Sequence, residues 1–394
     1  MAKTKTSSKN KVNKKMANGH AKPKETPEQL YASAIDHVEQ SQPEQALEQA
    51  KKLWQQVQHG SVTETLPALN LLGEINVELG DVDSARGYFE QAVALDPEGK
   101  VPEAMGGGAE KFLWLAQLSE EGGKVSVEWY EKGAIALQME IEALESGKIR
   151  GLDEESLLMM RVEKKRKLAN ALCSIVEVYM TDLSWEDDAE ARCESLVTQA
   201  MTVEDETSPE VLQTLASVRL SQERKQDAQS ALTRSLQTWR DLDPEDPAVP
   251  DFATRVSLAR LLMEAEMEGE AMDVLRRLVT DDDQSVEAWY LGGWCQYLVA
   301  DKMTAAKREA SEVEPAMKGS RNWLNMALKL YKQLEYEDER LCEHAKELVD
   351  GLNKVLGPEV ESTEGGAPEW EEWEGIDDDE DGEQEDEDEE MIDS

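Results

Sequence analysis

The sequence predicts an all-α protein, built as a right-handed superhelical solenoid of stacked helix pairs. Its composition is rich in Ala, Leu, Glu, Gln and Lys, which favour helices, and it contains only three Phe. No segment alternates apolar and polar residues as a half-buried strand would. One stretch spaces small and large apolar residues as two antiparallel helices require: Leu69, Leu72, Gly73, Gly80, Ala85, Phe89, Ala92 and Pro97.

The physical reason for this spacing is close packing. Gly73 and Ala85 are small enough to let two helices approach each other, while Leu72 and Phe89 fill the space between them. The pattern is that of a tetratricopeptide repeat, a helix–turn–helix unit of about 34 residues. One such unit cannot bury its own apolar face, so further and more divergent copies are expected, about seven in all.

The first three repeats are expected in the N-terminal half. The first covers 27–60 and begins at Pro27, because proline is favoured at the first helical position. The second covers 66–99. The third has a second helix that runs on to about Ser146, and a polar insertion from Glu145 to Glu155 follows at the repeat boundary.

The later repeats depart further from the pattern. The fourth has a stretched turn from Asp182 to Asp188, and the fifth begins at the cap Ser208-Pro209-Glu210. The sixth follows a proline-rich break, and the seventh opens at Ala288 and is expected to end near Pro315. A C-terminal helix pair then runs up to Gly357-Pro358.

Charge divides the chain into three parts. Residues 1–26 form a basic arm that is expected to be disordered, 27–357 form the solenoid, and 358–394 form an acidic tail that is also expected to be disordered. The formal net charge of −43 favours a cationic partner and argues against nucleic acid as a direct ligand.

Motifs for catalysis are absent from the sequence. The four His lack metal-ligand spacing, and Gly106-Gly107-Gly108 lacks the Lys-Ser/Thr end of a phosphate loop, so a flexible connection is expected there. The four scattered Cys are expected in the core, in a reducing compartment. No apolar segment is long enough to span a membrane, so we expect no membrane partner. Because the motifs are missing, we also expect that the protein is not an enzyme and binds no cofactor or metal. Its expected location is the cytoplasm and the nucleus.

The repeat register predicts which side chains line the inner face of the solenoid. These are Tyr31, Asn70, Glu74, Glu177, Glu210, Glu264, Glu287, Tyr290, Trp294 and Tyr297. Carboxylates from several helices in one groove would concentrate a basic segment, and aromatic side chains would anchor its apolar residues. Trp289 is expected in the core, and core packing remains the alternative for the three neighbouring aromatic residues.

The acidic tail is a second candidate site for the same kind of ligand. The residues proposed to bind are Trp370, Trp373, Asp377, Asp378 and Asp379. A tail that only keeps the protein soluble would not need two Trp, although that simpler role remains the alternative.

The layout of the chain resembles that of a known family. It combines a Lys-rich start, about seven divergent repeats with a final helix pair, and a tail of Trp and acidic residues from Trp370 to Asp381. The family is that of the fungal dedicated assembly chaperones for the fourth large-subunit ribosomal protein. The resemblance implies that the solenoid wraps a long internal loop of this basic client, prevents its aggregation and accompanies it into the nucleus. A nuclear import receptor would then be met through the client, and we expect the chain to be a monomer.

Two other functions fit parts of the sequence. A co-chaperone adaptor for heat-shock chaperones would need a clamp of Lys, Arg and Asn on the inner face, where the register places only Lys111 and Arg260 as basic residues. A histone chaperone would share the acidic tail and differ only in its client.

Overall fold

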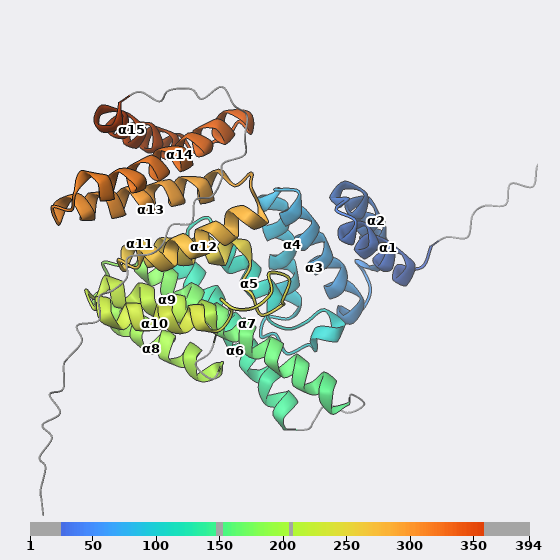
Figure 1. Ribbon diagram of the computed structural model, residues 1–394. Coiled ribbons are helices and arrows are strands. Elements are labelled where there is room, and N and C mark those ends of the chain that lie inside the picture. The colour runs from blue at the N-terminus through green and yellow to red at the C-terminus, as the bar shows by residue number, and fades with distance from the viewer. Residues whose placement is uncertain (1–24, 147–152, 205–207, 358–394) are drawn as a thin grey trace, which may run out of the picture. The chain divides into compact units, whose positions relative to one another are not determined.

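The computed structural model describes residues 25–146, 153–204 and 208–357, and every regular element within them is helical (Figure 1). The helices are α1 (Pro27–Glu39), α2 (Pro43–Val57), α3 (Val62–Glu78), α4 (Val82–Leu95), η1 (Glu103–Met105), α5 (Glu110–Gln117), α6 (Gly123–Glu145), α7 (Glu154–Met180), α8 (Ala189–Val203), α9 (Pro209–Ser221), α10 (Lys225–Gln237), α11 (Phe252–Glu264), α12 (Glu268–Asp281), α13 (Val286–Ala305), α14 (Ala310–Gln333) and α15 (Glu339–Leu356). The prediction of an all-α fold is confirmed.

The chain forms two compact units that meet within α7, between Ala171 and Leu172. In the first unit, each helix from α1 to α6 packs on the next one. In the second, α8 to α15 do the same, and α9, α11, α13 and α15 also contact one another in series. The first helices of successive pairs therefore form a continuous row in this unit, as expected of stacked repeats.

The second repeat has the packing that its spacing predicts. Leu69, Leu72, Phe89 and Ala92 are all buried. A Cβ atom added to Gly73 would lie 2.5 Å from Cζ of Phe89, so only glycine allows the ring to sit against α3. This close approach fixes how the two helices of the pair meet.

The displaced glycines of the seventh pair have a similar explanation. Gly292 packs directly against the ring of Trp323, and Trp289 is buried with its ring centroid 4.7 Å from that of Trp323. An indole ring of α14 thus packs against a glycine of α13, as the Phe89 ring of α4 packs against Gly73 of α3. The core position expected for Trp289 is confirmed.

One backbone turn recurs between the two helices of many pairs. Its central residue has a positive φ, and the next N–H donates to the carbonyl five residues earlier. The central residues are Ser41, Gly80, Glu223, Glu266, Lys307 and Glu335. Glycine, which adopts this conformation most easily, is present only in the clear second repeat, so in the other pairs the sequence does not reveal the turn.

Most predicted boundaries are confirmed. Helix α1 begins at Pro27, α6 continues to Glu145, and α9 begins beyond the cap Ser208. The boundary expected near Pro315 is wrong, because this residue lies inside α14. The buried residues Val313 and Ala316 on either side hold the helix against α13, which offsets the backbone hydrogen bond that proline cannot make. The C-terminal pair is α14 and α15, and α14 also packs along α13.

Candidate binding surface

In the first unit, four side chains from four helices interact electrostatically. We call Tyr31 of α1, Glu74 of α3, Glu110 of α5 and Lys167 of α7 the Glu74 cluster. The Lys167 ammonium lies 2.6 Å from Oε1 of Glu110. The Glu74 carboxylate in turn adds to the effect of burial in raising the pKa of Tyr31. Tyr31 and Glu74, both predicted from the register, are thus brought together.

The carboxyl group of Glu74 has an unusual pKa. Its side chain is exposed, yet the surrounding helices remove enough water to raise the pKa to about 7. The carboxylates of Glu110 and Glu78 raise it further, while Lys167 acts in the opposite direction. Ionising Glu74 costs free energy because the carboxylate is poorly hydrated and has acidic neighbours. A cation added at this position would therefore be stabilised.

Asn70 lies on the same helix as Glu74 but has a structural partner. Its Nδ2 donates to the carbonyl oxygen of Gly106 at 2.8 Å, and its buried Oδ1 has no hydrogen-bond partner among the described residues. The Gly106-Gly107-Gly108 loop is therefore held against α3. It connects two helices, as expected, and Gly107 packs so tightly on Val101 that no side chain would fit there.

In the second unit, acidic side chains from α7, α8 and α9 surround one thiol. Burial, and then the nearby Glu177, Glu204 and Glu210, raise the pKa of Cys173 to about 12. Glu177 is exposed, and desolvation raises the pKa of its carboxyl group as well. Glu210 accepts a hydrogen bond from the Ser208 hydroxyl at 3.0 Å. The structure thus groups two of the predicted acidic residues, Glu177 and Glu210.

The other two predicted acidic residues differ from each other. Glu264 is exposed at the end of α11. Glu287 is half-buried and forms an ion pair with Arg260, so its charge is already compensated. The second basic residue that the register placed on the inner face, Lys111, is fully buried with Nζ 2.9 Å from Oδ2 of Asp96.

The predicted aromatic anchors lie against the last helix. Tyr290, Trp294 and Tyr297 of α13 are half-buried and pack against apolar residues of α14 and α15. The phenol of Tyr290 and Nδ1 of His344 are hydrogen-bonded, and the His344 ring centroid lies 5.3 Å from that of Trp294. The structure therefore favours the alternative interpretation, in which these rings stabilise the C-terminal end of the fold.

Comparison with known proteins identifies the family. The tetratricopeptide repeat model matches residues 66–98. A protein of Emericella nidulans named "Probable assembly chaperone of rpl4" is 48% identical over 375 residues, which cover 91% of this chain and 90% of that protein. A Schizosaccharomyces pombe protein of the same name is 35% identical over 309 residues, covering 77% and 85%. The chain belongs to the family of assembly chaperones of rpl4.

A solved structure of the assembly-chaperone family agrees with this assignment. It is described as "Assembly Chaperone of RpL4 (Acl4) (Residues 1-338)" and is 49% identical to this chain. The superposition has a TM-score of 0.66 and covers 72% of this chain and 100% of that one. The family expected from the layout of the sequence is therefore confirmed.

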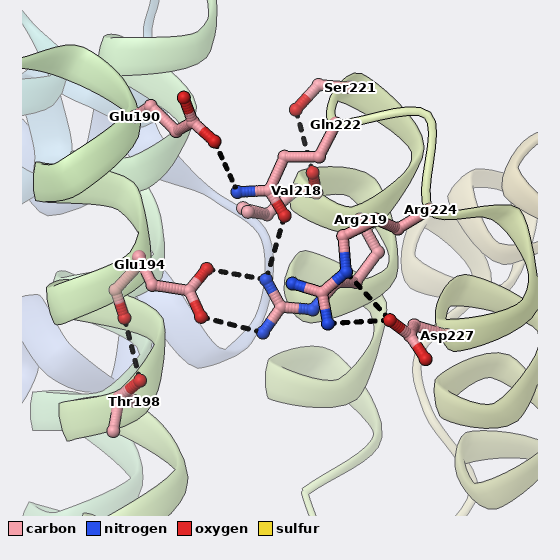
Figure 2. A network of polar contacts seen from close by, with 9 residues as sticks. All are labelled: Glu190, Glu194, Thr198, Val218, Arg219, Ser221, Gln222, Arg224 and Asp227. Atoms are coloured by element: carbon pink, nitrogen blue, oxygen red, sulfur yellow. Dashed lines mark hydrogen bonds and ion pairs between the residues drawn. The ribbon is translucent and has the colours of Figure 1, made fainter.

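In the present chain, two arginines of the α9–α10 pair are paired with the chain's own carboxylates. Figure 2 shows Arg219 of α9 facing Glu194 of α8, with Nη2 2.9 Å from Oε1. Gln222 bridges the same helices by donating to Oε1 of Glu190 at 3.2 Å, and Arg224 donates to Asp227 in the first turn of α10 (Figure 2). Because each of these arginines has a carboxylate partner, its charge is compensated within the chain.

Three exposed apolar residues that the repeat register does not predict lie near the start of α7. Leu158, Met159 and Val162 are 50%, 67% and 57% exposed. The sequence carries a signal for them, because Leu157 to Met160 are four consecutive apolar residues, and a single helix face cannot bury all four.

The remaining expectations concern the acidic tail, the cysteines, membrane spans and metal sites. The predicted tail residues, Trp370 to Asp379, lie outside the described residues. All four Cys are buried and free, as expected. Within the described ranges, no helix has the length and apolar character of a membrane span, and no group of three His, Cys, Asp or Glu is placed to hold a metal ion.

Proposed function

We propose that this chain is a chaperone for a newly made basic ribosomal protein. The client is the rpl4 protein that appears in the names of its relatives. The chain captures an extended loop of that client in an acidic concave groove, prevents its aggregation and escorts it to pre-ribosomes in the nucleus. The observation that carries the proposal is the Glu74 cluster, where an exposed carboxyl group with a raised pKa lacks sufficient compensating charge.

The mechanism is neutralisation combined with occlusion. Lys and Arg side chains of the client pair with Glu74 in the first unit and with Glu177 and Glu264 in the second. Each new pair offsets the cost that partial loss of hydration places on the ionised Glu74 and Glu177 carboxylates. The bound loop is thereby withheld from nucleic acid and from other copies of the client. Ribosomal RNA, with its denser negative charge, competes for the client and releases it.

This function requires no chemistry from the protein. We propose that the chain is not an enzyme, acts as a monomer without a direct nucleic-acid ligand, and meets an import receptor only through its client. The proposed function places the chain in both cytoplasm and nucleus.

The test is charge reversal with a matched control. Glu74→Lys/Glu177→Lys is expected to abolish co-purification of the basic client at low salt. Glu90→Lys/Glu270→Lys makes the same change in net charge at exposed positions on the second helices α4 and α12. It is expected to retain the client. Equal loss in both double variants would mean that only net charge matters, and the groove mechanism would be rejected.

The adaptor alternative receives no support from the side chains that it needs. Lys111 is buried with Asp96, and Arg260 is engaged by Glu287. Titration with an acidic C-terminal pentapeptide separates the two functions, because an adaptor would bind it and the proposed chaperone would not.

A further inference from the structure

We propose that the start of α7 is a docking ridge for apolar side chains of the basic client segment. The ridge consists of Leu158, Met159 and Val162. This inference rests on the proposed function and deepens it, since it says which residues of the client accompany the cations and where they bind.

The ridge is not part of the core that holds α7 in place. Lys164 and Leu168, on the opposite face of the helix, are buried, whereas the ridge residues are 50–67% exposed. Single exposed apolar residues are common on protein surfaces, but three within five residues form a patch of the kind that marks protein interaction sites.

The ridge is continuous with the Glu74 cluster along one helix. Met159, Glu163 and Lys167 are spaced four residues apart, so they follow one another along the same stripe of α7. Lys167 lies 3.2 Å from Glu163 and 2.6 Å from Glu110, which acts on Glu74. A segment bound at Glu74 therefore passes close to the ridge.

The charges around the ridge favour a basic occupant. Near the ridge, Lys164 and Lys165 are paired with the chain's own carboxylates, and the half-buried Arg161 is outnumbered by two exposed carboxylates. Lys164 lies 2.7 Å from Glu103 and 2.9 Å from Glu140, and Lys165 lies 3.6 Å from Glu145. The exposed Glu154 and Glu155 add negative charge in the first turn of α7. An apolar side chain flanked by Lys or Arg fits such a surface better than one flanked by acidic residues.

The geometry also sets the spacing within the client. From Met159 to Lys167 the helix rises by about 12 Å, at roughly 1.5 Å per residue. An extended chain covers that distance in about four residues. Because Lys167 contacts Glu110, it marks the level of the carboxylates with which a client cation would pair. The expected recognition element is therefore an apolar residue about four positions from a Lys or Arg.

The ridge is tested by a triple substitution to Gln, which keeps helix propensity and removes apolar contact. Leu158→Gln/Met159→Gln/Val162→Gln is expected to weaken binding of the client loop about tenfold. Because the lost contacts carry no charge, the salt dependence of the affinity should remain that of the wild type. Glu74→Lys should instead reduce the salt dependence.

A single pair of variants provides the matched control. Val162→Gln should weaken binding, whereas Val355→Gln, at a valine 69% exposed on α15, should not. Two synthetic basic peptides of equal composition test the spacing. The one with its Leu four residues from an Arg pair should bind the wild-type chain more tightly than the one with its Leu eight residues away.

The outcomes separate the two proposals. If Glu74→Lys abolishes client binding while the triple variant binds like the wild type, the ridge proposal is overturned and the proposed function stands. If the wild-type chain does not bind the client loop, both fail. If the triple variant changes only the sedimentation of the free chain, the occupant of the ridge is a second copy, and the proposal is equally wrong.

Discussion

The phenol oxygen of Tyr290 lies 2.8 Å from Nδ1 of His344, and this hydrogen bond joins α13 to α15. It places the last helix against aromatic side chains that would otherwise be open to a ligand.

The aromatic face of α13 should contribute to stability. Tyr290→Phe is expected to lower the free energy of unfolding by about 1 kcal/mol, the usual worth of a hydrogen bond. Trp294→Ala should cost more, about 2–3 kcal/mol, because the half-buried ring packs on α15. Urea denaturation measures both. A Trp294→Ala variant of unchanged stability and weakened client binding would show that the ring contacts the client.

Glu74 should make stability depend on pH. Its pKa of about 7 in the folded chain exceeds the ordinary value of 4.5, so the folded state binds more protons than the unfolded state between these two values. The contribution of Glu74 to stability therefore falls as pH rises through this window and is least favourable above pH 7. Glu74→Gln should gain stability relative to wild type at pH 8 but not at pH 4, as measured by thermal denaturation at each pH.

The affinity for the client should depend on pH in the opposite direction, again because of Glu74. A cation of the client stabilises the ionised form of Glu74, so binding releases a proton near neutral pH. The affinity of the wild type should rise between pH 6 and pH 8, and that of Glu74→Gln should change less. Calorimetry in buffers of different ionisation enthalpy counts the released protons. An equal count for the wild type and for Glu74→Gln would exclude Glu74 as their source.

The buried pair of Lys111 and Asp96 should be costly to break. Burial lowers the pKa of Lys111, and the ammonium depends on the carboxylate for compensation. Lys111→Met leaves Asp96 charged and buried, and should cost about 3–5 kcal/mol in urea denaturation. Adding Asp96→Asn should recover part of this loss. Strict additivity of the two changes would mean that the charges do not interact.

The recurring turn can be tested at positions without tertiary contacts. Gly80 has φ of 72°, and an added Cβ would meet no atom within 4 Å. Gly80→Ala should therefore cost about 1–2 kcal/mol from backbone conformation alone. The reverse change, Glu223→Gly at φ of 60°, should gain a fraction of that amount, since glycine also gives the unfolded chain more freedom. Equilibrium unfolding of the two variants should move in opposite directions.

The predictable part of this protein is what short-range spacing determines. The close approach of Gly73 and Phe89 follows from two positions in one repeat, and the register extended from it placed Tyr31 near Glu74. Proline and capping signals gave the starts of α1 and α9.

The rest depended on partners distant in sequence. The register treats Glu287 as a free acid on the inner face, and only the structure shows Arg260 beside it. It likewise treats Tyr290 as lining an open face, because nothing in the spacing of α13 indicates that α15 will cover it. Proposed site residues in the acidic groove remain predictions until a client is bound.

The shared turn separates the joints of the fold from its exposed surface. Six pairs of consecutive helices within the described residues close with the same backbone conformation, yet the central residue is Ser, Gly, Glu or Lys. The turn therefore depends on a φ angle, at a cost of about 1–2 kcal/mol, and hardly on side-chain identity. The exposed residues of the first helices, where the client is proposed to bind, can be exchanged without altering these joints.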